Sequence, residues 1–284
     1  MNMIRLMEKT RQALPLLACP FCGGGFTIRE NSLVCEKGHC YDWSRKGYGN
    51  LAPGHSQAGD SYSDELFESR GRILSGVFYQ KPMAAVAALL QKYLGTGFSL
   101  LDAGCGEGAW SRYLASVFPQ ATLLAVDLNR DGVSRGAAQP SPVHYLVADV
   151  KRLPVQTASL DGVLDVLTPA DYREFHRVLK PEGILLKVVP GQAYLQQIRQ
   201  EVSAHLHSGE VYSNARVLVH LQEHAQVLEQ LHLTETFPLT REQARDFLRM
   251  TPLTFSVSPE LLSQVKLEEI TVDLHLLCCR VLGE

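Results

Sequence analysis

The sequence predicts an α/β fold in which a mostly parallel sheet carries helices on both faces, preceded by a small cysteine-rich module. After Gly95, short apolar strands alternate regularly with helical patterns. The first of these strands runs into a glycine-rich turn, LDAGCGEG (101–108). Ahead of this region, four of the seven cysteines lie between Cys19 and Cys40. These three observations together define the expected architecture.

Length and composition limit the class of protein. At 284 residues, 45% of them hydrophobic, the chain can bury the core of one large domain and a small module. The formal net charge of -3 does not indicate a nucleic-acid-binding protein, so binding to RNA would need a local basic patch. No stretch approaches 18 uninterrupted apolar residues, and charged side chains interrupt Met1–Leu17. We therefore expect a cytoplasmic protein that is neither secreted nor membrane-spanning.

The regular part of the chain is expected to contain seven strands, at 99–104, 122–127, 143–150, 160–167, 183–189, 231–239 and 269–281. Helical spacing predicts helices at 64–74, 81–94, 107–118, 129–138, 170–179, 193–202, 217–230 and 241–250. This alternation is typical of a parallel sheet whose connections are helical.

The clustered cysteines predict a metal site and favour a reducing compartment. Cys19 and Cys22 form one pair, and Cys35 and His39 form a second after a hairpin-sized segment, a spacing that suits tetrahedral zinc. Because the protein would fill all four positions, the site is expected to be closed and structural. His39 and Cys40 are adjacent, and only one can point inward from a given turn. The spacing leaves both open as the fourth ligand.

These features divide the chain into four expected segments. Residues 1–15 form a short charged helix or a tail, and 16–54 form the zinc-binding module. Residues 55–95 supply a linker and the helices that lead into the core, and 96–284 form the main α/β domain. His55–Ser63 is small and polar, as in a linker or a mobile loop.

The glycine-rich turn predicts a cofactor site. Asp102 ends the first strand, and Gly104 and Gly106 let a ligand approach the backbone at the carboxyl edge of the sheet. Asp127 ends the second strand, where a carboxylate can accept both ribose hydroxyls. The spacing G-x-G-x-G differs from the G-x-G-x-x-G of dinucleotide sites, and Glu107 would repel a pyrophosphate but suits an ammonium and a sulfonium. The pattern therefore favours S-adenosylmethionine over NAD.

With both elements on one chain, the sequence resembles the RlmA-type 23S rRNA guanine-N1 methyltransferases over nearly its whole length. The motifs that carry the resemblance are CPFC (19–22), CEKGH (35–39), GYGNL (47–51), FYQKP (78–82), LDAGCGEG (101–108), RVLKPEG (177–183), the Pro190-Gly191 turn and RMTP (249–252). The resemblance implies a Rossmann-like class I methyltransferase with a mostly parallel seven-stranded sheet. ELFESRGRIL (65–74) is more similar to the RlmA-II or TlrB-like branch, which is linked to tylosin-type antibiotic resistance.

The resemblance also implies ligands and site residues. S-adenosylmethionine and structural zinc are the expected cofactors, and 23S rRNA is the expected partner, with a homodimer allowed and no membrane involved. Zinc falls to Cys19, Cys22, Cys35 and His39. The cofactor falls to Gly104, Gly106, Glu107 and Asp127, with Tyr79 and Tyr194 closing over it. The product would be N1-methylguanosine in a hairpin loop of domain II.

Two further aspartates end predicted strands. Asp149 is expected to reach the adenine amino group of the cofactor, or else to cap the following turn. Guanine N1 carries a proton at neutral pH, so a base is useful, and Asp165 is the expected catalytic residue. Capping is the alternative for Asp165 as well.

Contacts to RNA are expected from aromatic and basic residues. A guanine splayed out of a loop stacks on aromatic surface, for which Trp43, Tyr48 and Trp110 are the candidates. The zinc-binding module offers cations for phosphate contacts at Arg29, Lys37, Arg45 and Lys46.

Two other functions fit parts of the pattern. A small-molecule methyltransferase would use the zinc-binding module only for stability, which suits the acidic net charge. A non-enzymatic RNA-binding protein would carry a degenerate methyltransferase domain, but the intact LDAGCGEG and Asp127 disfavour it. Binding of S-adenosylmethionine separates the second alternative from an enzyme.

Overall fold

The structure is a computed structural model that describes residues 3–52, 64–202 and 213–283. Its main body is an eight-stranded sheet in the order β10-β11-β9-β8-β5-β6-β7-β4. Five neighbouring pairs, from β9 to β4, are parallel, and β11 runs antiparallel to both β9 and β10. The strands are β4 (Tyr48–Asn50), β5 (Ser99–Ala103), β6 (Thr122–Asp127), β7 (His144–Val147), β8 (Leu160–Val166), β9 (Leu179–Pro190), β10 (Ala225–Pro238) and β11 (Glu269–Val281).

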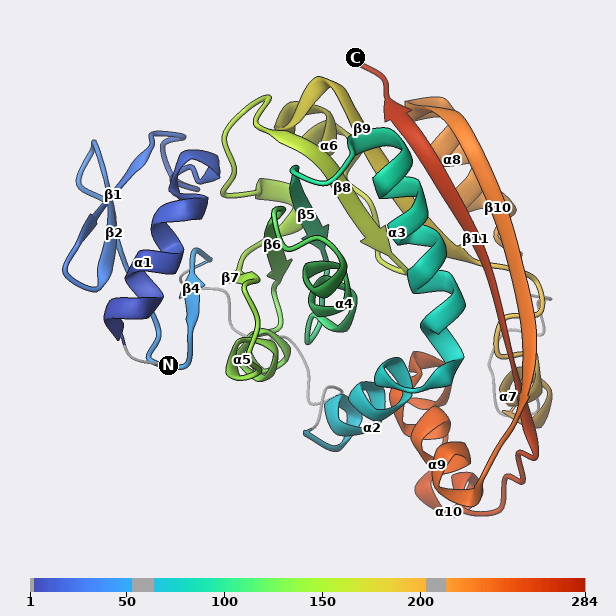
Figure 1. The fold of residues 1–284 in the computed structure, drawn as a ribbon. Coiled ribbons are helices and arrows are strands. Elements are labelled where there is room, and N and C mark those ends of the chain that lie inside the picture. The colour runs from blue at the N-terminus through green and yellow to red at the C-terminus, as the bar shows by residue number, and fades with distance from the viewer. Residues whose placement is uncertain (1–2, 53–63, 203–212, 284) are drawn as a thin grey trace.

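The seven expected strands are all present, and the sheet has the mostly parallel character that the sequence predicts (Figure 1). The eighth strand, β4, was not predicted. It belongs to the N-terminal module and adds to the β7 edge in parallel register, with Tyr48 opposite Tyr145. The module is therefore continuous with the main sheet.

Helices cover both faces of the sheet. One face packs against α3 (Gln80–Leu94), α4 (Ala109–Val117), α7 (Gln196–Val202) and α9 (Arg241–Met250), and the opposite face packs against α1 (Met3–Ala13), α6 (Tyr172–Val178) and α8 (Ala215–His224). The remaining helices are α2 (Asp64–Ser75), α5 (Arg130–Ala138), α10 (Pro259–Leu262) and the short 3-10 turns η1 (Leu14–Leu16), η2 (Val77–Tyr79), η3 (Val150–Arg152) and η5 (Pro252–Thr254). Two apolar cores result, one on each side of the sheet.

The helix expected at 217–230 is partly wrong. α8 ends at His224, and residues 225–230 begin the long strand β10. From Glu229 to Pro238 the strand alternates between half-buried and exposed positions, and β10 pairs with β11 along its length apart from a bulge between Val227 and Glu229. Tertiary pairing with β11 thus overrides a local pattern that is compatible with a helix.

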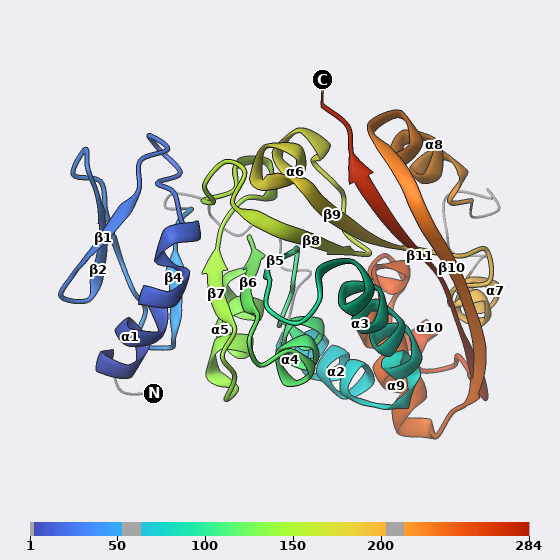
Figure 2. The ribbon, with the colours of Figure 1, turned by 45° about the horizontal axis from the view of Figure 1, so that its top comes forward.

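The N-terminal module contains α1 and a small antiparallel sheet of β1 (Phe26–Arg29), β2 (Ser32–Cys35) and β3 (Cys40–Asp42). Of the two expectations for residues 1–15, the structure shows the helix. α1 buries Leu6 and Met7 against the main sheet, and Lys9 Nζ donates to Ser141 O at 3.1 Å. Figures 1 and 2 show the module at the β7 end of the sheet, opposite β10 and β11.

The expected linker His55–Ser63 lies outside the described residues. Within the described ranges, no single helix has the length and apolar character needed to cross a membrane, and only the bent pair Glu65–Ser75 and Val77–Leu94 meets both criteria jointly.

Candidate cofactor and zinc sites

Cys19, Cys22, Cys35 and His39 meet at one end of the small sheet, with all four ligand atoms within 4.8 Å of one another. The Sγ atoms of Cys22 and Cys35 are 3.6 Å apart, and His39 Nδ1 lies 3.2 Å from Cys35 Sγ and 3.5 Å from Cys19 Sγ. Around a tetrahedral zinc with Zn–S bonds of about 2.3 Å, ligand atoms lie roughly 3.5–3.8 Å apart. The 3.5 and 3.6 Å separations match this range, and the 3.2 Å separation of His39 Nδ1 and Cys35 Sγ is slightly shorter. The four residues therefore fit zinc.

Backbone turns bring these ligands together. Gly23 follows the first ligand pair and Gly38 lies within the second, with positive φ angles of 72° and 81°, a conformation that glycine adopts without strain. Gly23 N donates to Cys19 O, and Gly38 N donates to Cys35 O. Cys40, the alternative fourth ligand, is exposed and lies outside the cluster.

The module is fastened to the main domain next to the zinc cluster. Ala18 N donates to Pro154 O, and Gln156 N donates to Leu16 O. Phe21, between the first two cysteines, is 70% exposed, and the Arg152 guanidinium lies 5.8 Å from the centre of its ring. The module thus presents an exposed aromatic ring beside a cation of the main domain.

The glycine-rich loop follows β5 at the carboxyl edge of the sheet. Gly104 and Gly106 have φ angles of 76° and 58°, and the amides of Gly104 and Cys105 both donate to Val126 O on β6. A Cβ on Gly104 would lie 2.4 Å from the Thr168 side chain, whereas a Cβ on Gly106 would meet nothing within 4 Å. Open space therefore faces the backbone at Gly106, as a ligand there requires.

Asp127 lies beside this open space. Its carboxylate accepts from Gly106 N at 2.8 Å and from Asn129 N at 2.7 Å. Burial raises its pKa, and these backbone bonds oppose the rise. Each carboxylate oxygen has a further lone pair, so the group can still accept hydroxyl hydrogens of a ribose. The geometry fits an adenosine-containing cofactor.

The two expected tyrosines meet. Tyr79, in η2, and Tyr194, after the Pro190-Gly191 turn, are far apart in sequence, but their hydroxyls are 2.7 Å apart. Tyr79 is fully buried, and burial raises its pKa well above the usual range. The Pro190-Gly191 turn is held by Asp273, whose backbone carbonyl accepts from Gly191 N and whose carboxylate accepts from Ala193 N. That these tyrosines contact a cofactor stays a prediction.

Asp102 and Glu107 have partners within the protein. Asp102 is buried beneath the loop and accepts from Ser111 Oγ on α4, so it joins the end of β5 to the next helix. Burial raises its pKa to about 7. Glu107 is paired with Arg112 at 3.3 Å. Neither arrangement tests a direct contact to a cofactor, which stays a prediction for both residues.

Asp149 caps η3, because its Oδ1 accepts from Lys151 N at 2.9 Å. This is the capping alternative that the sequence left open. The bond engages one oxygen of a half-buried carboxylate, and the adenine contact stays a prediction.

Asp165 is buried and paired with a lysine. Its side chain is 0% exposed, and its Oδ2 accepts from Lys187 Nζ at 2.8 Å. Lys187 also donates to Thr168 O, and Thr168 is the residue that packs against Gly104. Through Lys187, Asp165 helps to hold the turn beneath the glycine loop. Its expected role as the catalytic base stays a prediction.

The expected aromatic residues do not form an accessible stacking surface. Trp43, Tyr48 and Trp110 are each at least 92% buried in the two cores. Phe21 is the exposed aromatic ring of the zinc-binding module, and its position between two zinc ligands is the signal that sequence reasoning overlooked.

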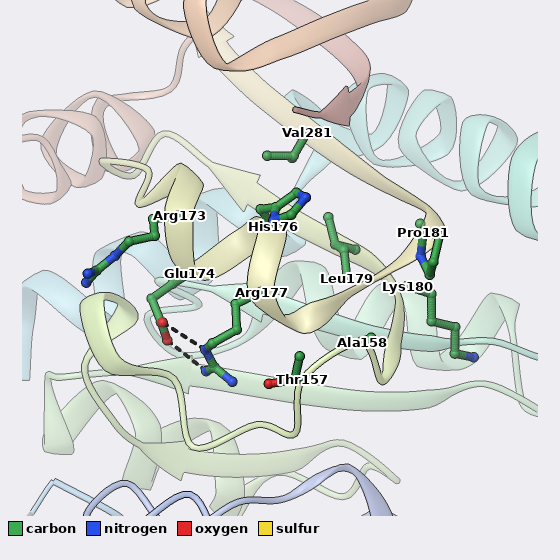
Figure 3. A pocket seen from close by; sticks show the side chains of 11 residues that line it. Thr157, Ala158, Arg173, Glu174, His176, Arg177, Leu179, Lys180, Pro181 and Val281 are labelled. Atoms are coloured by element: carbon green, nitrogen blue, oxygen red, sulfur yellow. Dashed lines mark hydrogen bonds and ion pairs between the residues drawn. The ribbon is translucent and has the colours of Figure 1, made fainter. Parts of the chain in front are cut away.

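Two surface cavities lie apart from the loop. The larger, about 680 Å³, is lined by α6 and the start of β9, and Figure 3 shows Arg177 paired there with Glu174. Lys180, which also lines it, pairs with Asp161. No predicted site residue lines it. The smaller, about 400 Å³, lies between the zinc-binding module and α5, where Arg45, Lys46 and Arg135 share its wall.

Comparison with known proteins agrees with this arrangement. Residues 100–183 match the family model described as "Methyltransferase domain", and residues 17–58 match the zinc-ribbon model described as "RlmA, N-terminal". A solved methyltransferase from Thiobacillus denitrificans, in complex with S-adenosyl-L-homocysteine, covers 77% of this chain and 97% of its own with a TM-score of 0.51. At 16% identity, that likeness shows the fold alone. The protein has the class I methyltransferase architecture with a zinc ribbon at its N-terminus.

Full-length relatives define the family. YxjB of Bacillus subtilis, assigned as a 23S rRNA (guanine-N1)-methyltransferase, is 33% identical over 92% of this chain and 96% of its own length. The 23S rRNA (guanine(748)-N(1))-methyltransferase of Streptomyces fradiae is 26% identical over 94% and 97%. The chain belongs to the 23S rRNA (guanine-N1)-methyltransferase family.

Proposed function

We propose that this protein transfers a methyl group from S-adenosylmethionine to N1 of a guanine in a hairpin loop of 23S rRNA. The supporting observation is that one chain holds a zinc cluster, in a module whose strand β4 extends the main sheet, and a glycine loop with its Asp127 partner at the carboxyl edge of that sheet. Relatives that span the whole chain, rather than its methyltransferase core alone, act on this substrate by name. The branch resemblance and the Streptomyces fradiae relative favour position 748.

The proposed reaction is an in-line displacement, in which a bond forms between guanine N1 and the methyl carbon as the bond from that carbon to the sulfonium sulfur breaks. S-adenosylhomocysteine is the leaving group, and the proton of N1 passes to a base. S-adenosylmethionine supplies the methyl group when bound. Asp127 and the backbone at Gly106 hold the adenosine part, and Tyr79 and Tyr194 close the site against water. Such positioning accounts for much of the expected rate.

The smaller cavity supports a role for the module in binding RNA. Arg45 and Lys46 are exposed at the turn before β4, and Arg135 of α5 lines the same cavity. Cations from two parts of the chain therefore line one concave surface, where they can contact a phosphate backbone. Phe21 adds an exposed ring for base stacking on the same module.

A salt series tests this function directly. The protein is incubated with labelled S-adenosylmethionine and a transcript of the 23S rRNA hairpin, beside a variant carrying Arg45→Ala and Lys46→Ala. We expect the variant to keep its cofactor affinity but to bind RNA more weakly, with a shallower salt dependence. Equal methylation by both proteins across the series would show that Arg45 and Lys46 of the module do not contribute to RNA binding. Methylation of a small acceptor but no RNA would support the small-molecule alternative.

Cellular location and oligomeric state are two further parts of the proposed function. Action on ribosomal RNA would place the reaction in the cytoplasm. The homodimer stays a prediction, and light scattering of the purified protein measures it.

A further inference from the structure

Helix α2 forms a wall of the cofactor site that the sequence had placed with the linker. A Cβ on Gly132 of α5 would lie 2.9 Å from the Phe67 ring and 3.0 Å from Gly106 O. A Cβ on Gly71 would lie 3.0 Å from the Glu107 carboxylate. One turn of α2 thus contacts both the glycine loop and the start of the helix after Asp127. Figure 2 shows α2 alongside α4 and α9.

Arg70 lies on this turn, three residues after Phe67 and next to Gly71, so it shares the side of α2 that faces the loop. It is half-buried, and its Nη2 donates to Met250 O, at the end of α9, at 2.9 Å. Its positive charge lowers the pKa values of both Asp127 and Tyr79 against the effect of burial. The guanidinium is therefore within electrostatic range of both the ribose acceptor and the tyrosine pair.

The carboxylate of the expected cofactor would be stabilised by a cation in the site. The expected cofactor contacts include the carboxylates of Asp127 and Glu107, which attract an ammonium and a sulfonium but repel a carboxylate, and they include no cation. The amino-acid end of S-adenosylmethionine carries a carboxylate as well. Arg112 is engaged by Glu107, through both its carboxylate and its backbone carbonyl. Arg70 presents five N–H donors, and the bond to Met250 O uses one of them.

We propose that Arg70 binds the carboxylate of the methionine end of S-adenosylmethionine, which makes α2 part of the cofactor site. The inference rests on the proposed function, since it concerns the same cofactor. It also gives a physical role to the RMTP motif: Met250 O orients the guanidinium from α9 while other N–H groups face the ligand.

Arg72, two residues further along α2, provides a matched control. Its Nε and Nη2 donate to the two oxygens of Asp246 on α9, at 2.8 and 2.6 Å. This bidentate pair fastens α2 to α9 without facing the glycine loop. Replacing Arg72 therefore disturbs the same helix contact but leaves the proposed carboxylate subsite in place.

The test compares two ligands that differ only in the carboxylate: S-adenosylmethionine and decarboxylated S-adenosylmethionine. Calorimetry measures the affinity of each for the wild-type protein, Arg70→Gln, Arg70→Lys and Arg72→Gln. We expect the wild-type protein to prefer S-adenosylmethionine by about 10- to 100-fold, the range for hydrogen bonds between charged groups. Arg70→Gln should lose this preference by weakening S-adenosylmethionine alone, whereas Arg70→Lys keeps part of it and Arg72→Gln keeps all of it.

Two results would overturn the inference while leaving the proposed function intact. One is equal weakening of both ligands by Arg70→Gln, which would mean that Arg70 only supports the fold. The other is an unchanged preference in Arg70→Gln, which would place the carboxylate elsewhere. Failure of the wild-type protein to bind S-adenosylmethionine at all would overturn the proposed function, and this inference with it.

Discussion

Lys187 and Asp165 form a buried ion pair on neighbouring strands, with Nζ and Oδ2 2.8 Å apart and both side chains at most 4% exposed. Asp165 lies opposite Lys187 in the parallel register of β8 and β9. Lys187 also donates to Thr168 O, and Thr168 packs against Gly104. The pair therefore connects the middle of the sheet to the loop that is expected to hold the cofactor.

Removing one member of this pair should destabilise the fold. Lys187→Met leaves the Asp165 carboxylate buried without its partner, and we expect a loss of about 3–5 kcal/mol in the free energy of unfolding, measured with urea. The double variant Lys187→Met, Asp165→Leu should recover most of this loss. If Asp165 were the catalytic base instead, Asp165→Asn would abolish turnover without changing stability or cofactor affinity.

Two substitutions at the glycine loop should weaken cofactor binding. Asp127→Ala removes the expected ribose acceptor, and Gly106→Val places a branched side chain into open space at a φ of 58°. We expect each to lower the affinity for S-adenosylmethionine by roughly 10- to 100-fold in calorimetry, with the fold retained by circular dichroism. Gly95→Val is the control, since Gly95 has a φ of 77° but lies at the end of α3. Unchanged affinity in both loop variants would place the cofactor elsewhere.

Zinc should be present at one equivalent and depend on the four clustered ligands. Cys22→Ser and His39→Ala should each lose zinc together with local structure, because metal binding is coupled to folding in a closed site. Cys40→Ser should keep its zinc. Elemental analysis should be repeated with His224→Ala, because an exposed group of His220, Glu223 and His224 on α8 could bind adventitious metal. Zinc lost from Cys40→Ser but kept by His39→Ala would reverse the ligand assignment.

Asp102 should make stability depend on pH. Burial raises its pKa to about 7, whereas an unfolded aspartate titrates near 3.9. The folded protein thus binds this proton more tightly, so the contribution is fully present below about pH 4 and is lost as the pH rises toward 7. The slope is at most roughly 1.4 kcal/mol per pH unit. Asp102→Asn should remove this slope from urea unfolding between about pH 4 and 7, and parallel profiles would contradict the assignment.

Much of the fold follows from local patterns. α9 and β11 have the bounds that the sequence predicts, since Thr240 supplies a capping box for α9 and a continuous apolar run marks a buried strand. β4 was not predicted because a strand of three residues is too short to show an alternating pattern. The C-terminal end of α8 was not predicted because neither glycine nor proline, the usual sequence signals of a helix end, follows His224.

The site was predictable where ligands are close in sequence and not where they depend on tertiary contacts. Three zinc ligands (Cys19, Cys22 and Cys35) and the loop around Gly106 follow from spacing, whereas the choice of His39 over Cys40 followed from the family resemblance. The orientation of Asp165 depends on which strand lies beside β8, and Lys187 becomes its partner only in the folded sheet. Arg70 lies on a helix with no motif of its own, and only packing brings it to the loop.

The most direct test of the central claim is nucleoside mapping by mass spectrometry of 23S rRNA from a strain that lacks this gene, compared with the parent and with a strain complemented by the intact gene. We predict that N1-methylguanosine in the domain II hairpin loop is present in the parent, absent from the deletion strain and restored by complementation, but not by the Asp127→Ala variant. Persistence of that nucleoside in the deletion strain, or loss of a methyl group from a different base or from a ribose, would contradict the proposed function.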